Sequence, residues 1–445
     1  MKLIRTTFRN ALRTPGFSLL YIGGVAFTIA FTLVYGFILY GQLGPVYPEY
    51  DRGSTYYLRQ TVYSRPNMMM QSNIGQPFID EFLRGEVKSV EDITSKVAFS
   101  FDYPMVQTGG KGPEFHVEVR NTDSNFGKFY KYEFLAGRYF SQQEMDAKER
   151  VAAISDKIAG RLFPSAQEAI GEVISIDHTK YRITGVFREG NALCSDSYGE
   201  VFIPYEKEII NDVNNVGWHC KYRGRLHVMM KVRPGMEDDL KRELREICQR
   251  ISAVDTTAAK FFIPSIESHP EHTLTGWQSV KDDDKYLTAP YRSWLDLGKP
   301  FLIGLLVILI IPALNISGLI GARLDRMRAD LGVQLCFGAS RRRILGKILT
   351  ENLVLTLAGG AIGLIAAWLI ASFGGHMLLQ LSAMDMFFDN KFGEDASIVT
   401  SEMAFAPLLF LLTLLVCLAL NLLSAWIPAS AALRRQTTEL LNSKK

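Results

Sequence analysis

Four stretches of the chain are apolar over the length of a helix that crosses a lipid bilayer, for which about 20 predominantly apolar residues are needed. The expected spans are 17–43, 300–322, 348–373 and 403–427. Leu, Ile, Gly and Ala dominate their interiors, and Trp368 and Trp426 stand toward span ends, where interfacial tryptophans are common. Buried helices of a soluble core are the alternative, but uncharged runs of this length are typical of membrane segments. The pattern predicts four transmembrane helices.

The first apolar stretch also has to be compared with a cleavable signal peptide. Its apolar region is longer than a signal peptide needs, and no small-x-small cleavage site followed by a polar start is evident. We therefore expect a retained signal-anchor helix.

Residues 44–299 carry the shorter patterns of a globular α+β domain. Two parts have the order strand, helix, strand, and helix 237–251 places Leu240, Leu244 and Ile247 on one face. The economical interpretation is a pair of β-α-β units, 44–110 and 224–290. The expected elements are strands 55–63 and 93–101 around helix 77–84, and strand 225–232 with extended segment 261–266 around helix 237–251.

The segment between these units, 111–223, has a pattern of its own. Alternation at 115–119 is followed by a buried strand at 151–155 and a helix at 156–162. Two further strands, 171–176 and 181–186, flank a turn at 177–180, which is a hairpin signal, and 201–204 is expected to be an edge strand. The predicted fold class is an α-helical membrane protein with four transmembrane helices plus an α+β extracytoplasmic domain inserted between helices 1 and 2.

The overall composition says little about the class of protein, because it averages segments of very different character. The 445 residues have a net charge of +3, 48% hydrophobic residues and a mean hydropathy of +0.07. These values exclude collagen-like, disordered and small disulfide-rich classes and give no reason to expect a nucleic-acid partner. The average is what apolar spans diluted by an ordinary globular domain would produce.

Basic residues are concentrated in three segments that a four-span topology places on one side of the membrane. Residues 1–16 carry four basic and no acidic side chains, and 323–347 carries seven basic against two acidic. The tail has four basic against one acidic, whereas 374–402 has one basic against five acidic. Because cytoplasmic loops are enriched in Lys and Arg, both termini are expected in the cytoplasm and 44–299 outside it.

The sequence lacks the motifs of several enzyme classes. It contains no G-x-x-x-x-G-K-[ST] phosphate loop, no G-x-S-x-G elbow and no H-E-x-x-H. His269 and His272 are expected to be solvated loop residues, because Pro270 disfavours a helical ligand face. Cys194 and Cys220 could pair as a disulfide outside the cytoplasm or remain free. We expect no catalytic residue, cofactor or metal site in this chain.

Two features of the predicted membrane helices have open interpretations. Glu351 is the ionisable residue within a span, which makes it a functional candidate, but it also stands one turn from Lys347 and could simply be paired at the cytoplasmic boundary. Gly359, Gly360 and Gly363 form a small-residue patch that would allow close helix packing, or they reflect ordinary glycine use in membrane helices.

The segment 329–364 carries the most specific signal. Its order is an acid with an aliphatic residue and glycine, a Gly-Ala-Ser with basic residues, a helix-borne glutamate and a Gly-Gly patch. This order closely resembles the FtsX/MacB-type ABC transporter permeases; segments 8–13, 134–140, 151–164, 170–186 and 426–429 are also similar to that family, so the resemblance covers nearly the whole chain. The matching residues are Asp330, Gly332, Gly338, Ala339, Ser340, Arg341, Glu351, Gly359, Gly360 and Gly363. Asp330 stands where the family more often has Glu, and 334–336 replaces a commonly more basic or alanine-rich stretch.

The resemblance implies a permease dimer, with an identical or paralogous second subunit, served by two separate cytoplasmic ATPase subunits that bind ATP and Mg²⁺. It implies a bacterial inner-membrane location, contact with membrane lipid and, as one further partner, a periplasmic adaptor. The function implied is export or handling of an envelope substrate such as a peptide, antibiotic or lipoprotein; the alternative is an FtsX-like regulator that activates a cell-wall hydrolase. The expected ATPase-coupling residues are Asp330, Gly332, Gly338, Ala339, Ser340, Arg341, Arg342 and Arg343.

These expectations divide the chain into nine parts and foresee one four-helix unit without a fused ATPase. The parts are a cytoplasmic amphipathic helix 1–16, span 17–43, the extracytoplasmic domain 44–299, span 300–322, a cytoplasmic coupling segment 323–347, span 348–373, an extracytoplasmic loop 374–402, span 403–427 and a cytoplasmic tail 428–445.

Overall fold

The computed structural model describes residues 15–65, 68–98, 104–108, 114–206, 222–254, 260–275, 294–373 and 407–434. The chain divides into two compact units. The helical unit contains Met1–Leu39, Gly298–Gly375 and Ser401–Lys445, and the α/β unit contains Tyr40–Leu297 and His376–Thr400. The helix expected at 1–16, the loop 374–402 and the end of the tail lie wholly or almost wholly outside the described residues.

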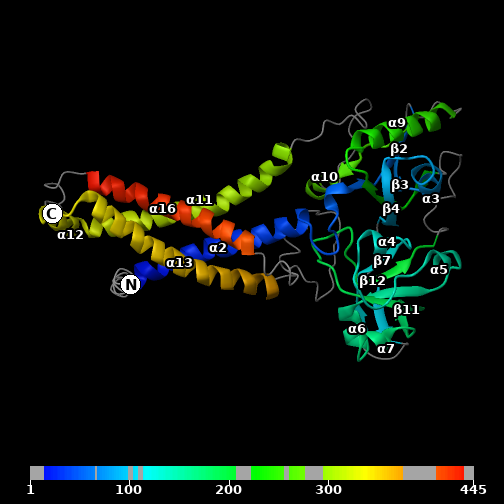
Figure 1. The fold of residues 1–445 in the computed structure, drawn as a ribbon, viewed down its shortest axis with the longest axis horizontal. Helices are drawn as coiled ribbons and strands as arrows, with labels where there is room; N and C mark the ends of the chain where they lie inside the picture. Colours follow the sequence, from blue (N-terminus) through cyan, green and yellow to red (C-terminus); the bar gives the residue numbers. More distant parts are fainter. Residues whose placement is uncertain are drawn as a thin grey trace. The chain divides into compact units, whose positions relative to one another are not determined.

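Long helices make up the helical unit (Figure 1). Within the described residues, three contain a stretch that is long and apolar enough to cross a membrane: Pro15–Leu43, Arg341–Ile370 and Leu411–Ala431. The second expected span lies in a helix of 33 residues, within whose described part the apolar run is Phe301–Ile310. The helices are α2 Pro15–Leu43, α11 Trp294–Arg326, α12 Arg328–Cys336, α13 Arg341–Phe373 and α16 Pro407–Arg434.

The predicted coupling segment 323–347 is mostly helical. It contains the end of α11, all of α12 and the first two turns of α13. Helix α13 begins seven residues before the expected span because charged side chains end an apolar run without ending the backbone hydrogen-bonding pattern. The apolar pattern therefore predicts where the apolar run lies, and the helix extends beyond that run.

The α/β unit is a mixed sheet with short helices. The chain order is β1 Thr55–Leu58, β2 Thr61–Arg65, β3 Met68–Ile74, α3 Gln76–Phe78, the π-helix Ile79–Leu83, β4 Val90–Val97, β5 Met105–Thr108, β6 Phe115–His116, β7 Val119–Thr122, α4 Phe126–Phe129, β8 Phe134–Gly137, α5 Gln142–Asp146, β9 Val151–Ser155, α6 Asp156–Leu162, α7 Ala166–Ala169, β10 Val173–Ile176, β11 Thr179–Phe187, β12 Val201–Pro204, β13 Arg223–Gly224, β14 Leu226–Val232, α9 Glu237–Val254, β15 Lys260–Phe262, β16 Glu267–Ser268 and α10 His269–Thr275.

Strand pairing brings the two β-α-β segments together. The main path is β15-β2-β3-β14-β4-β7-β12-β9-β11-β10-β5-β6, and β4 and β14 pair antiparallel along their lengths. Leu240, Leu244 and Ile247 of α9 join the core formed by these strands. A second core lies around β9, β10 and β11. Strand β5 pairs with β10, so the second core takes in residues that precede 111.

Three predictions within this unit can be compared with the structure directly. The hairpin is confirmed, and Asp177 and His178 have φ values of 44° and 65°, as a type I′ turn requires. The expected strand 55–63 is two strands, because the ladder is interrupted at Arg59 and Gln60. The edge-strand prediction for Val201–Pro204 is wrong: β12 lies between β7 and β9. A short apolar run is also what a strand buried on both faces looks like.

Candidate functional site

The turn between α12 and α13, residues 336–343, is hereafter called the basic turn. Gly338 has φ +84°, its N–H donates to Leu335 O at 3.1 Å, and the Ala339 N–H donates to Gln334 O at 3.0 Å. This is the Schellman arrangement, in which a left-handed residue after the helix satisfies its last carbonyls. A glycine is favoured at 338 because a side chain would be strained there.

Ser340 begins the next helix. Its Oγ accepts a hydrogen bond from the Arg343 N–H at 3.3 Å, as an N-cap does. Arg341, Arg342 and Arg343 are all exposed in the first turn of α13. Cations at a helix N-terminus are disfavoured by the helix dipole, by roughly 0.3–1 kcal/mol each. The three arginines therefore do not serve the stability of α13, and their charge is available to an anionic surface.

Phe337 is a feature of the basic turn that sequence reasoning missed. The side chain is 88% exposed, the largest exposed fraction among the large hydrophobic side chains of the described residues. An aromatic directly before the turn glycine was the available signal, but the sequence does not show whether such a ring folds back onto the helix. Asp330 and Gly332 lie in α12, on the N-terminal side of this turn.

A second cluster ties three helices together. The Arg323 guanidinium of α11 lies 3.1 Å from a Glu351 carboxylate oxygen of α13, and it also lies over the Phe17 ring of α2, 4.8 Å from the centroid. Glu351 is buried. The sequence suggested Lys347 as the partner; the ion pair in the structure is instead with Arg323, which is distant in sequence but adjacent in the bundle.

The glycine patch of α13 lies against two neighbouring helices. A Cβ on Gly359 would fall 2.8 Å from Val25 Cβ, and one on Gly363 would fall 2.7 Å from the Ala26 carbonyl oxygen, both on α2. A Cβ on Gly360 would fall 3.0 Å from Leu414 of α16. Distances this short leave no room for a larger residue at 359 or 363 without moving α2.

The α/β unit contains a buried polar network around the last turn of α2. Arg52, 5% exposed, has an ion pair of 2.7 Å with Glu49, and its guanidinium also donates to the carbonyls of Gly41 and Gly44. His269 Nε2 lies 2.8 Å from the Gln42 carbonyl oxygen. Side chains far apart in sequence thus bind the carbonyl end of α2, whose last C=O groups have no partner within the helix. We call this network, with Lys96, Asp196 and His272, the junction.

The prediction that His269 and His272 are solvated loop residues is wrong. They lie on α10, which accepts Pro270 because its first turn needs no N–H from that position. His272 Nε2 lies 2.5 Å from Asp196 Oδ2, and Lys96 Nζ lies 2.9 Å from Asp196 Oδ1. The described residues contain no cluster suited to a metal ion. The histidines belong to a buried hydrogen-bonded network.

The junction contains a free thiol. Cys194 is buried and unpaired with another cysteine, and the Arg52 guanidinium donates to its Sγ at 3.1 Å. Burial raises the pKa of the Cys194 thiol well above its ordinary value. Cys220, its proposed disulfide partner, lies outside the described residues.

The charged side chains of the junction shift one another's pKa values. Burial would lower the pKa of His272, but the carboxylates of Asp196 and Glu267 outweigh burial and raise it above 6.5. Burial would raise the pKa of Asp196, but His272 and Lys96 hold it well below 3.8. The imidazolium form of His272 is therefore favoured by folding.

This shift predicts a pH dependence of stability. Because the folded-state pKa of His272 is raised, its contribution is complete below about pH 6.5, the ordinary value, and is lost as pH rises through the folded-state pKa. Thermal unfolding of the full chain should show that His272→Gln is destabilised relative to wild type most at about pH 6 and less at about pH 9. A deficit that grows with pH would contradict the assignment, and His116→Gln, on the exposed side of β6, controls for the loss of any imidazole.

Helices long and apolar enough to cross a membrane, in one chain with a large α/β domain, define the class of a membrane protein with a globular domain. Two family models match the chain: the MacB-like periplasmic core domain over residues 18–247 and the FtsX-like permease C-terminal over residues 302–437. The first alone covers just over half of the sequence. The chain belongs to the FtsX/MacB-type ABC transporter permease family.

Individual relatives and solved structures share little sequence identity with this chain. The macrolide export ATP-binding/permease proteins MacB of Shigella boydii and Escherichia coli K12 are each 21% identical over 324 residues, which is 73% of this chain and 43% of theirs. The chain thus spans less than half the length of these relatives. The periplasmic region of MacB from Actinobacillus actinomycetemcomitans is 10% identical, with a TM-score of 0.33 over 51% of this chain and 94% of that one. The extracellular domain of the ABC-type transporter YknZ is 14% identical, with a TM-score of 0.31 over 46% and 99%.

Proposed function

We propose that this chain is the permease subunit of an ABC transporter that couples ATP hydrolysis on separate cytoplasmic ATPase subunits to movement of its extracytoplasmic domain. The observation that carries the proposal is the basic turn, which presents the exposed Phe337 ring beside three exposed arginines. Aromatic and arginine side chains together are the composition of protein-binding hot spots. ATP and Mg²⁺ would be bound by the partner, since these 445 residues contain no phosphate loop.

The proposed topology has four spans, α2, α11, α13 and α16, with both termini and the basic turn in the cytoplasm. Two permease subunits, identical or paralogous, would form the membrane part and two ATPases the motor. The distribution of basic residues supports this orientation.

Helix α2 is suited to transmit motion along its length. It runs unbroken for 29 residues, about 44 Å at 1.5 Å per residue. Near its start Phe17 contacts Arg323, and at its end the junction holds the carbonyls of Gly41, Gln42 and Gly44. The last turn of α2 is therefore held by hydrogen bonds from buried side chains, and a displacement of that turn would act directly on Arg52 and His269.

The topology predicts the labelling pattern of Cys336. This thiol is exposed next to Phe337, whereas Cys194, Cys248 and Cys417 are buried. A membrane-impermeant maleimide should modify Cys336 in inverted membrane vesicles and leave it unmodified in intact cells or spheroplasts, as read by peptide mass mapping. Labelling of Cys336 from outside would reverse the proposed orientation.

Co-purification tests the function itself. The tagged chain, expressed in its native membrane, should retain an ATPase subunit that hydrolyses ATP, and ATP should change protease accessibility of the extracytoplasmic domain. Absence of any ATPase, or unaltered activity when Gly338 is replaced by valine, would argue against the proposal. The MacB relatives are macrolide export proteins by name, which favours envelope export over hydrolase activation. Crosslinking of the α/β unit to a cell-wall hydrolase instead would favour the FtsX-like regulator.

A further inference from the structure

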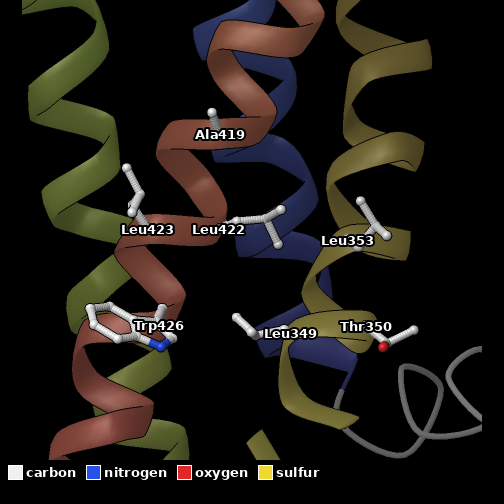
Figure 2. Close-up of a pocket in the computed structure, with 7 residues that line it drawn as sticks. All are labelled: Leu349, Thr350, Leu353, Ala419, Leu422, Leu423 and Trp426. Carbon is white, nitrogen blue, oxygen red and sulfur yellow. The ribbon is translucent and has the colours of Figure 1, made fainter. Parts of the chain in front are cut away.

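An apolar groove of about 420 Å³ lies between α13 and α16 (Figure 2). Its volume is within the range of roughly 300–1,000 Å³ found for pockets that hold small organic ligands. The Thr350 hydroxyl in its wall donates to the Gly346 carbonyl at 2.7 Å, so that group is already satisfied. The other principal lining residues are Leu349 and Leu353 on α13 and Leu422, Leu423 and Trp426 on α16.

The groove opens on the outside of the helical unit. Leu423 is 54% exposed and Trp426 is 46% exposed, although both belong to the apolar segment Leu411–Ala431. Side chains of this kind on a membrane-spanning helix face hydrocarbon rather than water. An acyl chain is therefore the natural occupant of the apolar part.

One end of the groove is basic. Arg343 and Lys347 are exposed, and they precede Thr350 by seven and three residues on α13. Because residues at spacings of three, four and seven share a helix face, both lie below the groove on the same face, about 5–10 Å toward the start of the helix. Figure 2 shows Trp426 level with Leu349 and Thr350 at this same end. Tryptophan prefers the level of the lipid headgroups.

We propose that the groove binds an anionic phospholipid of the cytoplasmic leaflet, with an acyl chain between α13 and α16 and the phosphate held by Arg343 and Lys347. The inference rests on the proposed orientation of α13. Apolar walls, an interfacial tryptophan and two cations on one face are the elements of a headgroup site between helices. A second copy of the chain would cover the apolar walls as well, but two cations on the same face favour an occupant that carries an anionic group.

Native mass spectrometry can test the site directly. The full chain would be reconstituted in nanodiscs with equal amounts of phosphatidylglycerol and phosphatidylcholine, released, and the retained lipids counted. Each of the two cations, Arg343 and Lys347, that binds the phosphate should enrich phosphatidylglycerol over phosphatidylcholine about fivefold among the retained lipids. Leu423→Trp, which fills the groove, and Arg343→Gln, which removes a cation, should each reduce that enrichment severalfold.

Matched variants separate the groove from general effects. Leu415 on α16 is also 54% exposed and does not line the groove, so Leu415→Trp should keep the enrichment. Arg341→Gln removes a charge from the same turn on another face of α13 and should keep it too. No preference in wild type, or equal losses in all four variants, would overturn the proposal.

The remaining outcomes are also decisive. If Leu423→Trp reduces the oligomer to a monomer while phosphatidylglycerol enrichment persists, the groove is a subunit interface and the lipid assignment is wrong. The measurement uses the permease without its ATPase, so a negative result leaves the proposed function intact. Labelling of Cys336 from outside would instead contradict the orientation on which both proposals depend.

Discussion

Replacing Phe337 by aspartate is expected to abolish stable association with the proposed ATPase partner. The Phe337 ring is 88% exposed, so it contributes little to the folding stability of the chain. An aromatic anchor that is buried at an interface contributes about 2–4 kcal/mol to the free energy of binding. A loss of this size lowers affinity by roughly 30- to 1,000-fold. Binding of the ATPase subunit to the reconstituted permease, with ATP turnover as a second reading, measures the effect.

The variant is informative because it should leave the fold intact. Exposed positions without special contacts usually change stability by less than about 0.5 kcal/mol. Leu135→Asp places the same carboxylate at a 50% exposed leucine of the α/β unit and should leave ATPase binding unchanged. Phe337→Leu should retain part of the affinity. Wild-type binding by Phe337→Asp would show that the basic turn is not the docking element.

Replacing Arg52 by methionine is expected to destabilise the α/β unit strongly. The substitution leaves Glu49, which is 3% exposed, without its 2.7 Å partner and removes the donors to Gly41 and Gly44. Breaking a buried ion pair from one side typically destabilises by about 3–5 kcal/mol. At about 2–4 °C per kcal/mol for a domain of this size, the unfolding midpoint should fall by roughly 6–20 °C.

Two comparisons isolate the cause of that loss. Arg250→Met disrupts an ion pair with Glu86 in which both side chains are largely exposed, and it should change stability by less than about 1 kcal/mol. The double variant Glu49→Gln with Arg52→Met removes the unpaired charge and should recover part of the loss. If all three variants unfold at the wild-type midpoint, the junction does not anchor the end of α2.

Local signals predicted the elements that depend on local causes. The hairpin at Asp177 and His178 and the helix Asp156–Leu162 were predicted because turn residues and side-chain periodicity act within a few positions. The position of β12 could not be predicted the same way. An apolar run of four residues reads alike at an edge and in the middle of a sheet, and only pairing with β7 and β9 distinguishes them.

The sequence by itself determined the class of protein: long apolar runs, the uneven distribution of basic residues and the segment 329–364 define a membrane permease, because each is a property of neighbouring residues. Only the tertiary structure decided the partner of Glu351, the burial of His269, the pairing of His272 with Asp196, and the exposure of Phe337. Partners 28 to 227 positions apart along the chain, such as Arg323 with Glu351 and Gln42 with His269, meet only when the fold is complete. The chemistry of such sites therefore depends on three-dimensional proximity, which sequence spacing does not encode.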